Sequence, residues 1–421
     1  MEKIAIVGSG ISGLGCAWFL HRKFDVTVFE ADDRIGGHSN TVTINEDGKE
    51  IPIDTGFMVY NNVTYPNLTR LFDELDVPTK PSSMSFSVNH RPTNTQWRGA
   101  SLKYLFGDRR NLFSLRFWRF LLQLNRFNKE AVAALDELEW QHMTLAEYVE
   151  ARGYGEDFME CYLIPMSSAV WSTPQEKMME FPAVTLLRFW HNHGFLGAKT
   201  QHPWRTVEGG SRSYVKRMTE PFLDRIHTNS PVTSVRREDD GVWLDVKGRE
   251  SEKFDKVILA THAPQSLRML DEPTDLEAEL LSKFKYEPNA VKLHSVPQYM
   301  PEVRRCWASW NYRTDKKGKA TTHYWMNSLQ GVSDKKDYFV SLNTDGIEKD
   351  VCHKELEYEH PLFDLEAVQS QGRLKELNKK DGVNRTFYCG AWFRYGFHED
   401  GLLSAVELCN NLLGGDPWEK R

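Results

Sequence analysis

The sequence predicts an α/β protein built on a Rossmann-like unit, and three observations near its start predict this class. Residues 4–7 are all apolar, as in a strand buried within a parallel sheet. A second strand-like run, 25–29, ends in Glu30. Between the two runs stand a helix-like stretch and three glycines at G-x-G-x-x-G spacing: Gly8, Gly10 and Gly13. This order of strand, glycines, helix, strand and acid predicts a crossover that binds a dinucleotide.

Each part of the crossover has a physical task in holding a pyrophosphate. Gly8 permits a tight turn, Gly10 lets the backbone approach the phosphates, and Gly13 lets the helix pack close to the strand. The helix start at Ile11 and Ser12 offers free N–H groups and the positive end of the helix dipole. The acid that ends the second strand can accept hydrogen bonds from both ribose hydroxyls. We therefore expect a dinucleotide that contains ADP-ribose.

A second glycine pair shortly after the acid narrows the choice of dinucleotide. NAD does not require a second close backbone approach at this place. A cofactor that folds back across the crossover does require it, together with a cation near its phosphates. The expected contacts in this segment are Ala31, Arg34, Gly36, Gly37, His38 and Ser39.

Motifs at both ends of the chain resemble those of the flavin-containing amine oxidase superfamily, which includes monoamine oxidases, phytoene desaturases and protoporphyrinogen oxidases. The matching elements follow one another in the family's order: 54–56, 208–210, 230–235, 256–261, 388–392 and 396–405. The resemblance implies FAD, with Val232 on its adenine and Gly390, Gly401 and Leu402 at the last FAD-binding strand and helix. It also implies a Rossmann-like FAD-binding domain (a three-layer β-β-α arrangement) interleaved with an α+β substrate domain.

Three segments narrow the resemblance within the superfamily. These segments are 37–41, 307–312 and 396–401. They resemble bacterial predicted NAD/FAD-binding oxidoreductases and the flavin domain fused to plant cyclopropane fatty acid synthases. Three departures from the superfamily pattern accompany them. His38 replaces the second arginine of the Gly-Gly-Arg motif, and Ala391 stands where many relatives carry an acid. The Ser-Gly-Gly-Cys attachment sequence is absent, since Cys389 precedes Gly390, so we expect non-covalent FAD.

The expected domains are discontinuous in the sequence. The FAD-binding domain is expected at 1–60, 205–265 and 376–421. The substrate domain is expected at 61–204 and 266–375, with a mainly helical pattern from about 66 to 200 and mixed strands and loops later.

Bulk properties exclude several classes of protein. A net charge of −6 and a sequence pI near 6.2 argue against a nucleic-acid partner. The six cysteines are scattered and form no C-x-x-C pair, which indicates neither zinc nor a disulfide framework. The two histidines of His191-Asn192-His193 lack a third ligand, so no metal is expected. The absence of a signal peptide and of an 18-residue apolar run predicts a cytoplasmic protein, peripheral to a membrane at most.

The candidate catalytic residues are Lys292, His398 and Glu399. The flavin carries the redox step, a hydride passing from a substrate C–H to its N5 atom, while the protein orients and shields it. Lys292 follows the apolar pair Ala290-Val291, and the resemblance implies a role for it, since amine oxidases often carry a lysine water-bridged to N5 in a comparable strand. A surface lysine fits the same pattern. His398 and Glu399 lie in the turn before Gly401, where catalysis and ordinary capping both remain open.

Two aromatic-rich regions carry alternative interpretations. Trp307, Trp310 and Tyr312 could wall a substrate cavity or belong to the core. Residues 112–127 form an amphipathic helix with a polar, basic stripe: Arg116, Arg119, Gln123 and Arg126. Such a helix can lie transiently on an anionic membrane surface and admit an acyl substrate, or it can pack between domains with a solvated arginine face.

Three functions follow from these patterns. The first is an FAD-dependent oxidoreductase that dehydrogenates, desaturates or isomerises an apolar small molecule, such as a lipid acyl chain or polyene. The second is a flavin amine oxidase that produces peroxide. The third is a non-catalytic FAD-binding partner of an acyl-chain-modifying enzyme.

Overall fold

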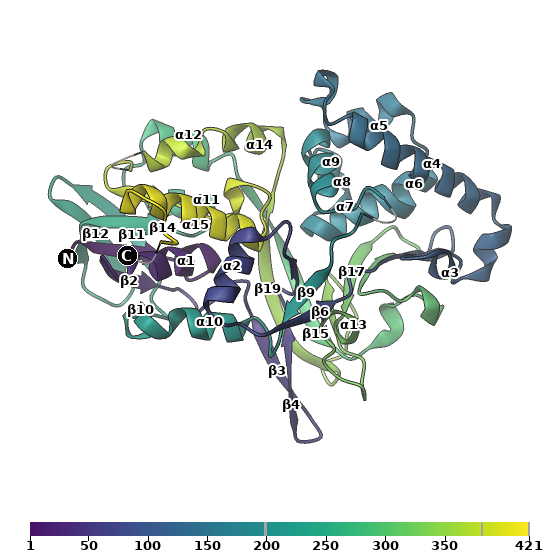
Figure 1. The fold of residues 1–421 in the computed structure, drawn as a ribbon, viewed down its shortest axis with the longest axis horizontal. Helices are drawn as coiled ribbons and strands as arrows, with labels where there is room; N and C mark the ends of the chain where they lie inside the picture. Colours follow the sequence, from purple (N-terminus) through teal and green to yellow (C-terminus); the bar gives the residue numbers. More distant parts are fainter. Residues whose placement is uncertain (198–199, 380–381, 420–421) are drawn as a thin grey trace.

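A five-stranded parallel sheet forms one end of the computed structural model, which describes residues 1–197, 200–379 and 382–419 (Figure 1). Its strand order is β10-β2-β1-β14-β20, and every neighbouring pair is parallel. Ile4, Ala5 and Ile6 of the central strand are completely buried, which agrees with the apolar run in the sequence. The bounds in sheet order are Ile226–His227, Asp25–Phe29, Lys3–Val7, Lys256–Leu259 and Thr386–Tyr388.

Smaller sheets flank this parallel sheet. The antiparallel sheet β11-β12-β13 contacts β14 and β1. The β3-β4 hairpin projects at the bottom of Figure 1, and β5-β9-β6 forms a third small sheet. The bounds in numerical order are β3 Thr41–Glu46, β4 Lys49–Asp54, β5 Tyr60–Asn61, β6 Thr79–Ser82, β9 Trp204–Val207, β11 Val232–Glu238, β12 Gly241–Val246 and β13 Glu252–Phe254.

A seven-stranded mixed sheet forms the second large layer, in the order β19-β15-β18-β17-β16-β7-β8. Its pairs are antiparallel except for β16 with β7, which are parallel. The bounds in sheet order are Cys352–Leu362, Lys285–His294, Phe339–Leu342, Ala320–Trp325, Trp310–Thr314, Phe86–His90 and Thr95–Gly99. Because β6, β7 and β8 lie within 79–99, the prediction of a mainly helical segment from 66 to 200 is wrong for this part.

The helices gather in two places (Figure 1). Helices α3 to α9 lie at the far right, while α1, α10, α11, α12, α14 and α15 surround the parallel sheet. The bounds are α1 Ile11–Leu20, α2 Pro66–Glu74, α3 Leu102–Leu105, α4 Leu115–Ala133, α5 Leu145–Arg152, α6 Glu156–Phe158, α7 Ile164–Trp171, α8 Gln175–Met178, α9 Ala183–Asn192, α10 Arg212–Thr219, α11 Ala263–Met269, α12 Asp275–Leu281, α13 Met326–Gln330, α14 Leu365–Gln371 and α15 His398–Leu413. Within the described ranges no helix combines the length and the apolar character needed to cross a membrane.

The basic stripe expected along 112–127 is only partly solvated. Arg119 and Arg126 are exposed, and Arg126 Nε lies 2.7 Å from Glu130 on the same helix. Arg116 pairs with Asp157, and the amide oxygen of Gln123 accepts from Gly155 N at 2.7 Å, so these two side chains bind the start of α6. Large apolar side chains of α4 also face solvent. The hydrophobic period of a sequence shows that a helix has a polar and an apolar face, but it does not show which face packs against the rest of the protein.

The buried carboxylate of Asp54 joins four segments at the end of β4. One oxygen accepts from Thr41 Oγ1 at 2.5 Å and from Ser211 N at 2.9 Å. The other accepts from Gln330 Nε2 at 2.7 Å. Burial raises the pKa of Asp54, and these donors oppose the rise. The segment after β4 is therefore fixed to β3, to the start of α10 and to α13.

Replacing this acceptor should test its structural weight. Asp54→Asn places an amide N–H₂ among donors, and we expect it to lower the free energy of unfolding by about 2 to 3 kcal/mol. The measurement is urea denaturation, with the exposed Asp136→Asn as the matched control. Equal stability of the two variants would contradict this assignment.

Candidate functional site

The N-terminal glycine loop leads directly from β1 into α1. A Cβ atom at Gly13 would lie 1.9 Å from Gly8 O, so the helix could not pack on the loop with any larger residue there. Gly10 is the N-cap of α1 and has no side chain to accept the N–H groups of the first turn at Ile11 and Ser12. These groups point to an anion-binding helix start, as the sequence predicts.

Glu30 closes one side of this loop at the end of β2. Its Oε2 accepts from Ser9 N at 2.9 Å and from Ser9 Oγ at 2.5 Å. Glu30 O accepts from Ser230 N at 2.8 Å, which brings the start of β11, with Val232, beside the end of β2. Ala31 follows at the exposed surface. The residues expected on the ADP-ribose side therefore adjoin one another.

The second glycine pair lies against the first loop. Gly36 N donates to Ser9 O at 3.0 Å. Gly37 has a positive φ of 56°, and a Cβ atom there would lie 3.0 Å from Gly10 Cα. The guanidinium of Arg34 donates to Gly37 O at 2.7 Å and so fixes the turn. The two glycine motifs, well separated in sequence, form one backbone cradle.

His38 presents an unpaired polar atom next to this cradle. Its Nε2 is buried and has no hydrogen-bond partner among the described residues. The ring centroid lies 4.8 Å from that of Tyr358 and 5.4 Å from that of His360. Burial, with the neighbouring histidines, lowers the pKa of His38, so the ring is neutral at pH 7. A buried ring nitrogen without a partner fits a site that a polar ligand completes.

The C-terminal helix meets the cradle at its first turn. A Cβ atom at Gly401 would lie 2.8 Å from Ile11 Cγ2 and 2.9 Å from Ser12 Oγ, so α15 approaches the start of α1 closely. Leu402 is fully buried, and Gly390 N donates to Ser404 Oγ at 2.9 Å, which joins the end of β20 to α15. The cradle thus combines both ends of the chain. Its glycines, free helix N–H groups and unpaired His38 fit a pyrophosphate-containing cofactor such as FAD.

His398 is partly buried between the second glycine segment and α10. Its ring stacks on Phe57 with centroids 4.0 Å apart. Its Nε2 lies 2.6 Å from Tyr214 Oη and 3.2 Å from Ser39 Oγ. Burial lowers the pKa of His398 to about 3, so the ring is neutral. Sequence reasoning missed Tyr214 and Phe57, because both lie far from His398 in the chain.

Glu399 caps a helix from a distant part of the chain. Its carboxylate accepts from Asn67 N at 3.0 Å, from Asn67 Nδ2 at 2.7 Å and from Leu68 N at 2.9 Å. These donors belong to the first turn of α2. A carboxylate at a helix N-terminus stabilises the helix dipole and satisfies free N–H groups. The contacts therefore favour the capping interpretation over a proton-transfer role.

Lys292 contacts a different part of the molecule. Its Nζ lies 3.2 Å from Glu355 on the neighbouring strand β19. That glutamate side chain is 63% exposed, so the ion pair lies near solvent. The partners of Lys292 and those of His398 belong to different elements, and the structure does not bring these two candidates into one group.

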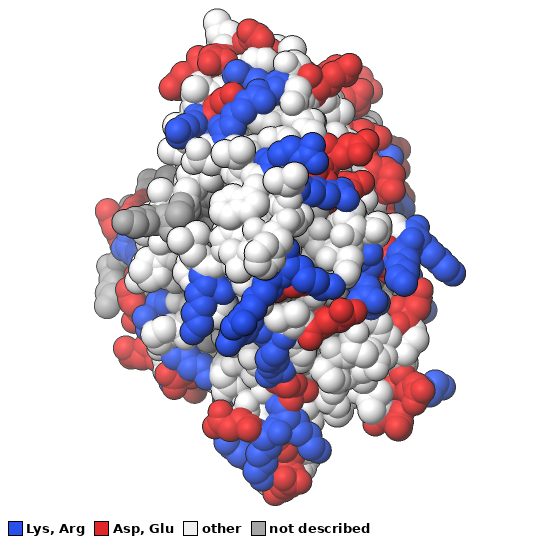
Figure 2. Space-filling model, turned by 90° about the vertical axis from the view of Figure 1, so that its right-hand side faces the viewer, with Lys and Arg blue, Asp and Glu red and all other residues white. Residues whose placement is uncertain are grey.

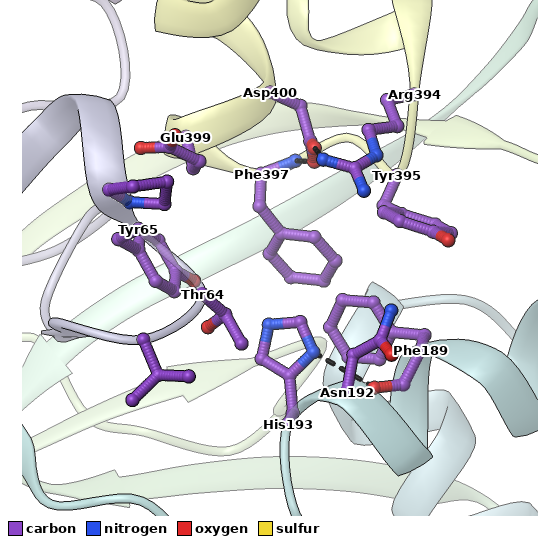
Figure 3. A pocket seen from close by; sticks show the side chains of 12 residues that line it. Thr64, Tyr65, Phe189, Asn192, His193, Arg394, Tyr395, Phe397, Glu399 and Asp400 are labelled. Atoms are coloured by element: carbon purple, nitrogen blue, oxygen red, sulfur yellow. Dashed lines mark hydrogen bonds and ion pairs between the residues drawn. The ribbon is translucent and has the colours of Figure 1, made fainter.

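A cavity of about 360 Å³ adjoins the first turn of α15 (Figure 3). Its wall combines four aromatic side chains, Tyr65, Phe189, Tyr395 and Phe397, with polar and charged ones, among them Asn192 and Arg394. His193 points its ring into the space while its Nδ1 lies 2.9 Å from Phe189 O, and burial lowers its pKa to about 4. Among the described residues no group of three His, Cys, Asp or Glu side chains is placed to hold a metal.

Asp400 is, beside Glu399, one of the two acids in this cavity wall. Its Oδ2 accepts from Phe397 N at 2.9 Å, and Arg394 Nη1 lies 3.9 Å from Oδ1. Burial raises the pKa of Asp400 to about 7. Sequence reasoning did not single out this residue, because its pattern is that of an ordinary acid in the first turn of a helix.

The aromatic residues of 307–312 divide between core and cavity. Trp307 packs with Met300 and Phe339 in a small buried cluster, so the core interpretation holds for it. Tyr312 lines a second cavity of about 300 Å³ together with Gln175, whose Nε2 donates to Tyr312 Oη at 3.1 Å. This second cavity is lined mainly by polar side chains and by residues of β17.

The glycine crossover and the adjoining helix define a dinucleotide-binding protein, and sequence comparison identifies its family. A family model described as flavin containing amine oxidoreductase matches residues 11–297. The chain belongs to this family, and membership implies a flavin cofactor. Amine oxidase [flavin-containing] A of Canis lupus familiaris is 27% identical over 285 residues, 62% of this chain and 49% of that protein. The chain thus spans about half the length of the curated relatives it matches.

Solved structures share the fold over nearly the whole chain. Cyclohexylamine oxidase from Brevibacterium oxydans superposes with a TM-score of 0.69 at 16% identity, covering 98% of this chain and 99% of that one. A CLA-producing fatty acid isomerase from P. acnes superposes with a TM-score of 0.67 at 16% identity, covering 97% of each chain. At such low identity the likeness shows the fold alone, and it confirms the predicted fold class.

The cradle can be tested at Gly10 without disturbing the core. A Cβ atom at Gly10 would have no heavy atom of the described chain within 4 Å, so Gly10→Ala should fold normally. We expect it to weaken FAD binding about tenfold or more, because the methyl group blocks backbone approach to the pyrophosphate. Titration of apoprotein with FAD measures this, with Gly372→Ala as control, where the new Cβ meets only Gln369 O at 3.9 Å. Unchanged FAD affinity in Gly10→Ala would contradict the assignment.

The raised pKa of Asp400 predicts a pH-dependent stability. A folded-state pKa of about 7, above the ordinary 3.8, means that folding favours the protonated acid. The contribution of Asp400 to the free energy of unfolding is therefore fully present near pH 4 and is lost as the pH rises to 7. Relative to Asp400→Asn, the wild type should lose at most about 1.4 kcal/mol per pH unit in this window. Urea denaturation at several pH values measures the difference, with the exposed Asp350→Asn as control. Parallel profiles for wild type and Asp400→Asn would refute the assignment.

Proposed function

We propose that the protein is an oxidoreductase with non-covalently bound FAD that dehydrogenates, desaturates or isomerises an apolar substrate such as a lipid acyl chain or polyene. The cofactor would be held by the glycine cradle, by Glu30 and Val232 on the ADP-ribose side, and by the backbone of Gly401 and Leu402. When bound, FAD would supply the hydride acceptor for a substrate C–H bond.

The surroundings of Cys389 support non-covalent binding. Its thiol is buried with Sγ 3.7 Å from Cys16 Sγ, beside the helix α1. Burial and the hydrogen bond with Cys16 raise the pKa of Cys389, which keeps the thiol protonated and a poor nucleophile. This cysteine is thus used in packing between β20 and α1.

The proposed class of substrate rests on the side chains in the wall of the cavity beside α15. Both oxygens of Glu399 accept from the start of α2, and Asp400 has a pKa near 7 with Phe397 N as a donor. The guanidinium of Arg394 lies in the same wall, 3.9 Å from Asp400, and offsets the negative charge that an ammonium group would need, while four aromatic rings offer apolar surface. This combination favours a neutral, apolar substrate. The shared fold of the fatty acid isomerase is compatible with such a substrate.

The chain's own residues would then bind, orient and shield rather than transfer protons. Phe189 and Phe397 stack with ring centroids 4.8 Å apart and would present an apolar wall to the substrate. The neutral rings of His193 and His398 add no charge to this region. An apolar enclosure suits hydride abstraction from carbon, since it prevents side reactions with water.

The relationship to amine oxidases supports a second candidate, a peroxide-producing amine oxidase. The curated relatives that match are named amine oxidases. For this chain the substrate would be an amine, and the aromatic rings of the cavity would face its cation.

One experiment separates these functions. Purified holoprotein should show a flavin spectrum, and anaerobic addition of cellular lipid extract should bleach it, whereas a panel of amines should not. Aerobic peroxide assays with the same amines provide the control. Bleaching by amines alone would establish the second candidate. Bleaching by neither, with FAD-dependent activation of an acyl-modifying enzyme, would indicate a non-catalytic partner and overturn the proposal.

A further inference from the structure

An apolar surface projects from the end of the molecule opposite the parallel sheet. Six large hydrophobic side chains there are exposed, and they come from a single stretch of the chain: Leu102, Leu112, Phe113, Leu115, Trp118 and Leu122. We call this the α3–α4 surface. Phe113 is 89% exposed and Leu115 is 81% exposed. Such a concentration of exposed apolar groups marks an interaction site.

The α3–α4 surface is a preorganised structure. Trp118 Nε1 donates to Leu112 O at 3.0 Å, and its ring lies 5.3 Å from that of Phe106 at the end of α3. Leu115, Trp118 and Leu122 follow one another at helical spacing, so they share one face of α4. Tryptophan held at the edge of an apolar surface is typical of membrane interfaces.

Positive charge flanks these apolar groups. The stretch 102–122 contains five Lys or Arg residues and one acid, although the whole chain has a net charge of −6. That acid, Asp108, is buried and paired with Arg110 at 2.6 Å, and Arg116 pairs with Asp157 outside the stretch. Among the described residues, Lys103, Arg109 and Arg119 are therefore the exposed cations of the stretch without an ion pair. Figure 2, which faces this end of the molecule, shows uncharged surface in the middle, with Lys and Arg side chains above and below it and Asp and Glu side chains at its edges.

We propose that the α3–α4 surface docks the protein on the surface of an anionic lipid bilayer. Phe113, Leu115 and Leu122 would enter the acyl boundary, and Lys103, Arg109 and Arg119 would meet the lipid phosphates. The charge pattern favours this partner, because apolar groups flanked by cations match a negatively charged apolar interface. This docking rests on exposed apolar groups and charge and not on the proposed reaction, so vesicle binding and substrate turnover can fail independently.

Vesicle sedimentation of the full-length holoprotein tests the proposal. Vesicles of phosphatidylcholine with about one-third phosphatidylglycerol should bind the wild type, and pure phosphatidylcholine should bind it about tenfold less. Raised salt should weaken the binding. Phe113→Ser/Leu115→Ser should lower the partition about tenfold or more, with Leu138→Ser/Leu223→Ser, also exposed, as matched control.

Charge variants separate the electrostatic contribution to vesicle binding from the apolar one. Lys103→Gln/Arg109→Gln/Arg119→Gln should abolish the preference for anionic vesicles, while the exposed control set Lys49→Gln/Lys216→Gln/Lys247→Gln should retain it. All variants should keep the wild-type melting temperature and flavin absorbance. Absence of binding, or equal binding by wild type and both α3–α4 variants, would overturn the proposal. A wild-type dimer that Phe113→Ser/Leu115→Ser dissolves would overturn it as well, because the occupant would be a second copy.

Discussion

The packing of the last helix against the first is the constraint on which the candidate site depends. On one side α1 lies so close to the glycine loop that a Cβ atom at Gly13 would meet Gly8 O at 1.9 Å. On the other side α15 lies so close that a Cβ atom at Gly401 would meet Ile11 Cγ2 at 2.8 Å. Close packing on both sides fixes the start of α1, and with it the N–H groups that would face the phosphates. The two ends of the chain therefore build one cradle.

The first turn of α15 then distributes three neighbouring side chains to three parts of the molecule. Successive helical residues point about 100° apart. His398 reaches Tyr214 and Ser39, Glu399 reaches the start of α2, and Asp400 returns to Phe397 N. Each of these polar groups is at least partly buried and would cost free energy without its partner, so this turn serves as a joint between the cofactor side and the cavity side.

Local signals predicted the glycine crossover of β1, α1 and β2 well, because its parts are close in sequence. The glycines, the strand runs and Glu30 lie within one crossover, where spacing alone carries the geometry. Strand β7 was missed for a physical reason. All of Phe86–His90 is buried, polar residues included, so the alternation expected of a half-exposed strand is absent. The partners of His398, Glu399 and Asp54 were equally hidden, since a single sequence contains no signal that joins residues hundreds of positions apart.

The seven-stranded sheet links the cradle to the α3–α4 surface. At one edge β19 carries Tyr358, whose hydroxyl lies 2.9 Å from Asn40 Nδ2 and 2.8 Å from Thr55 Oγ1, next to the segment of His38. At the opposite edge β8 packs against α3. A hydrogen-bonded sheet is stiff, so a molecule held at the α3–α4 surface would also have its cradle held in a defined orientation. Helix α9 contacts α4 and carries Phe189 and Asn192 of the cavity wall, so the helical layer that bears the α3–α4 surface also reaches the cavity.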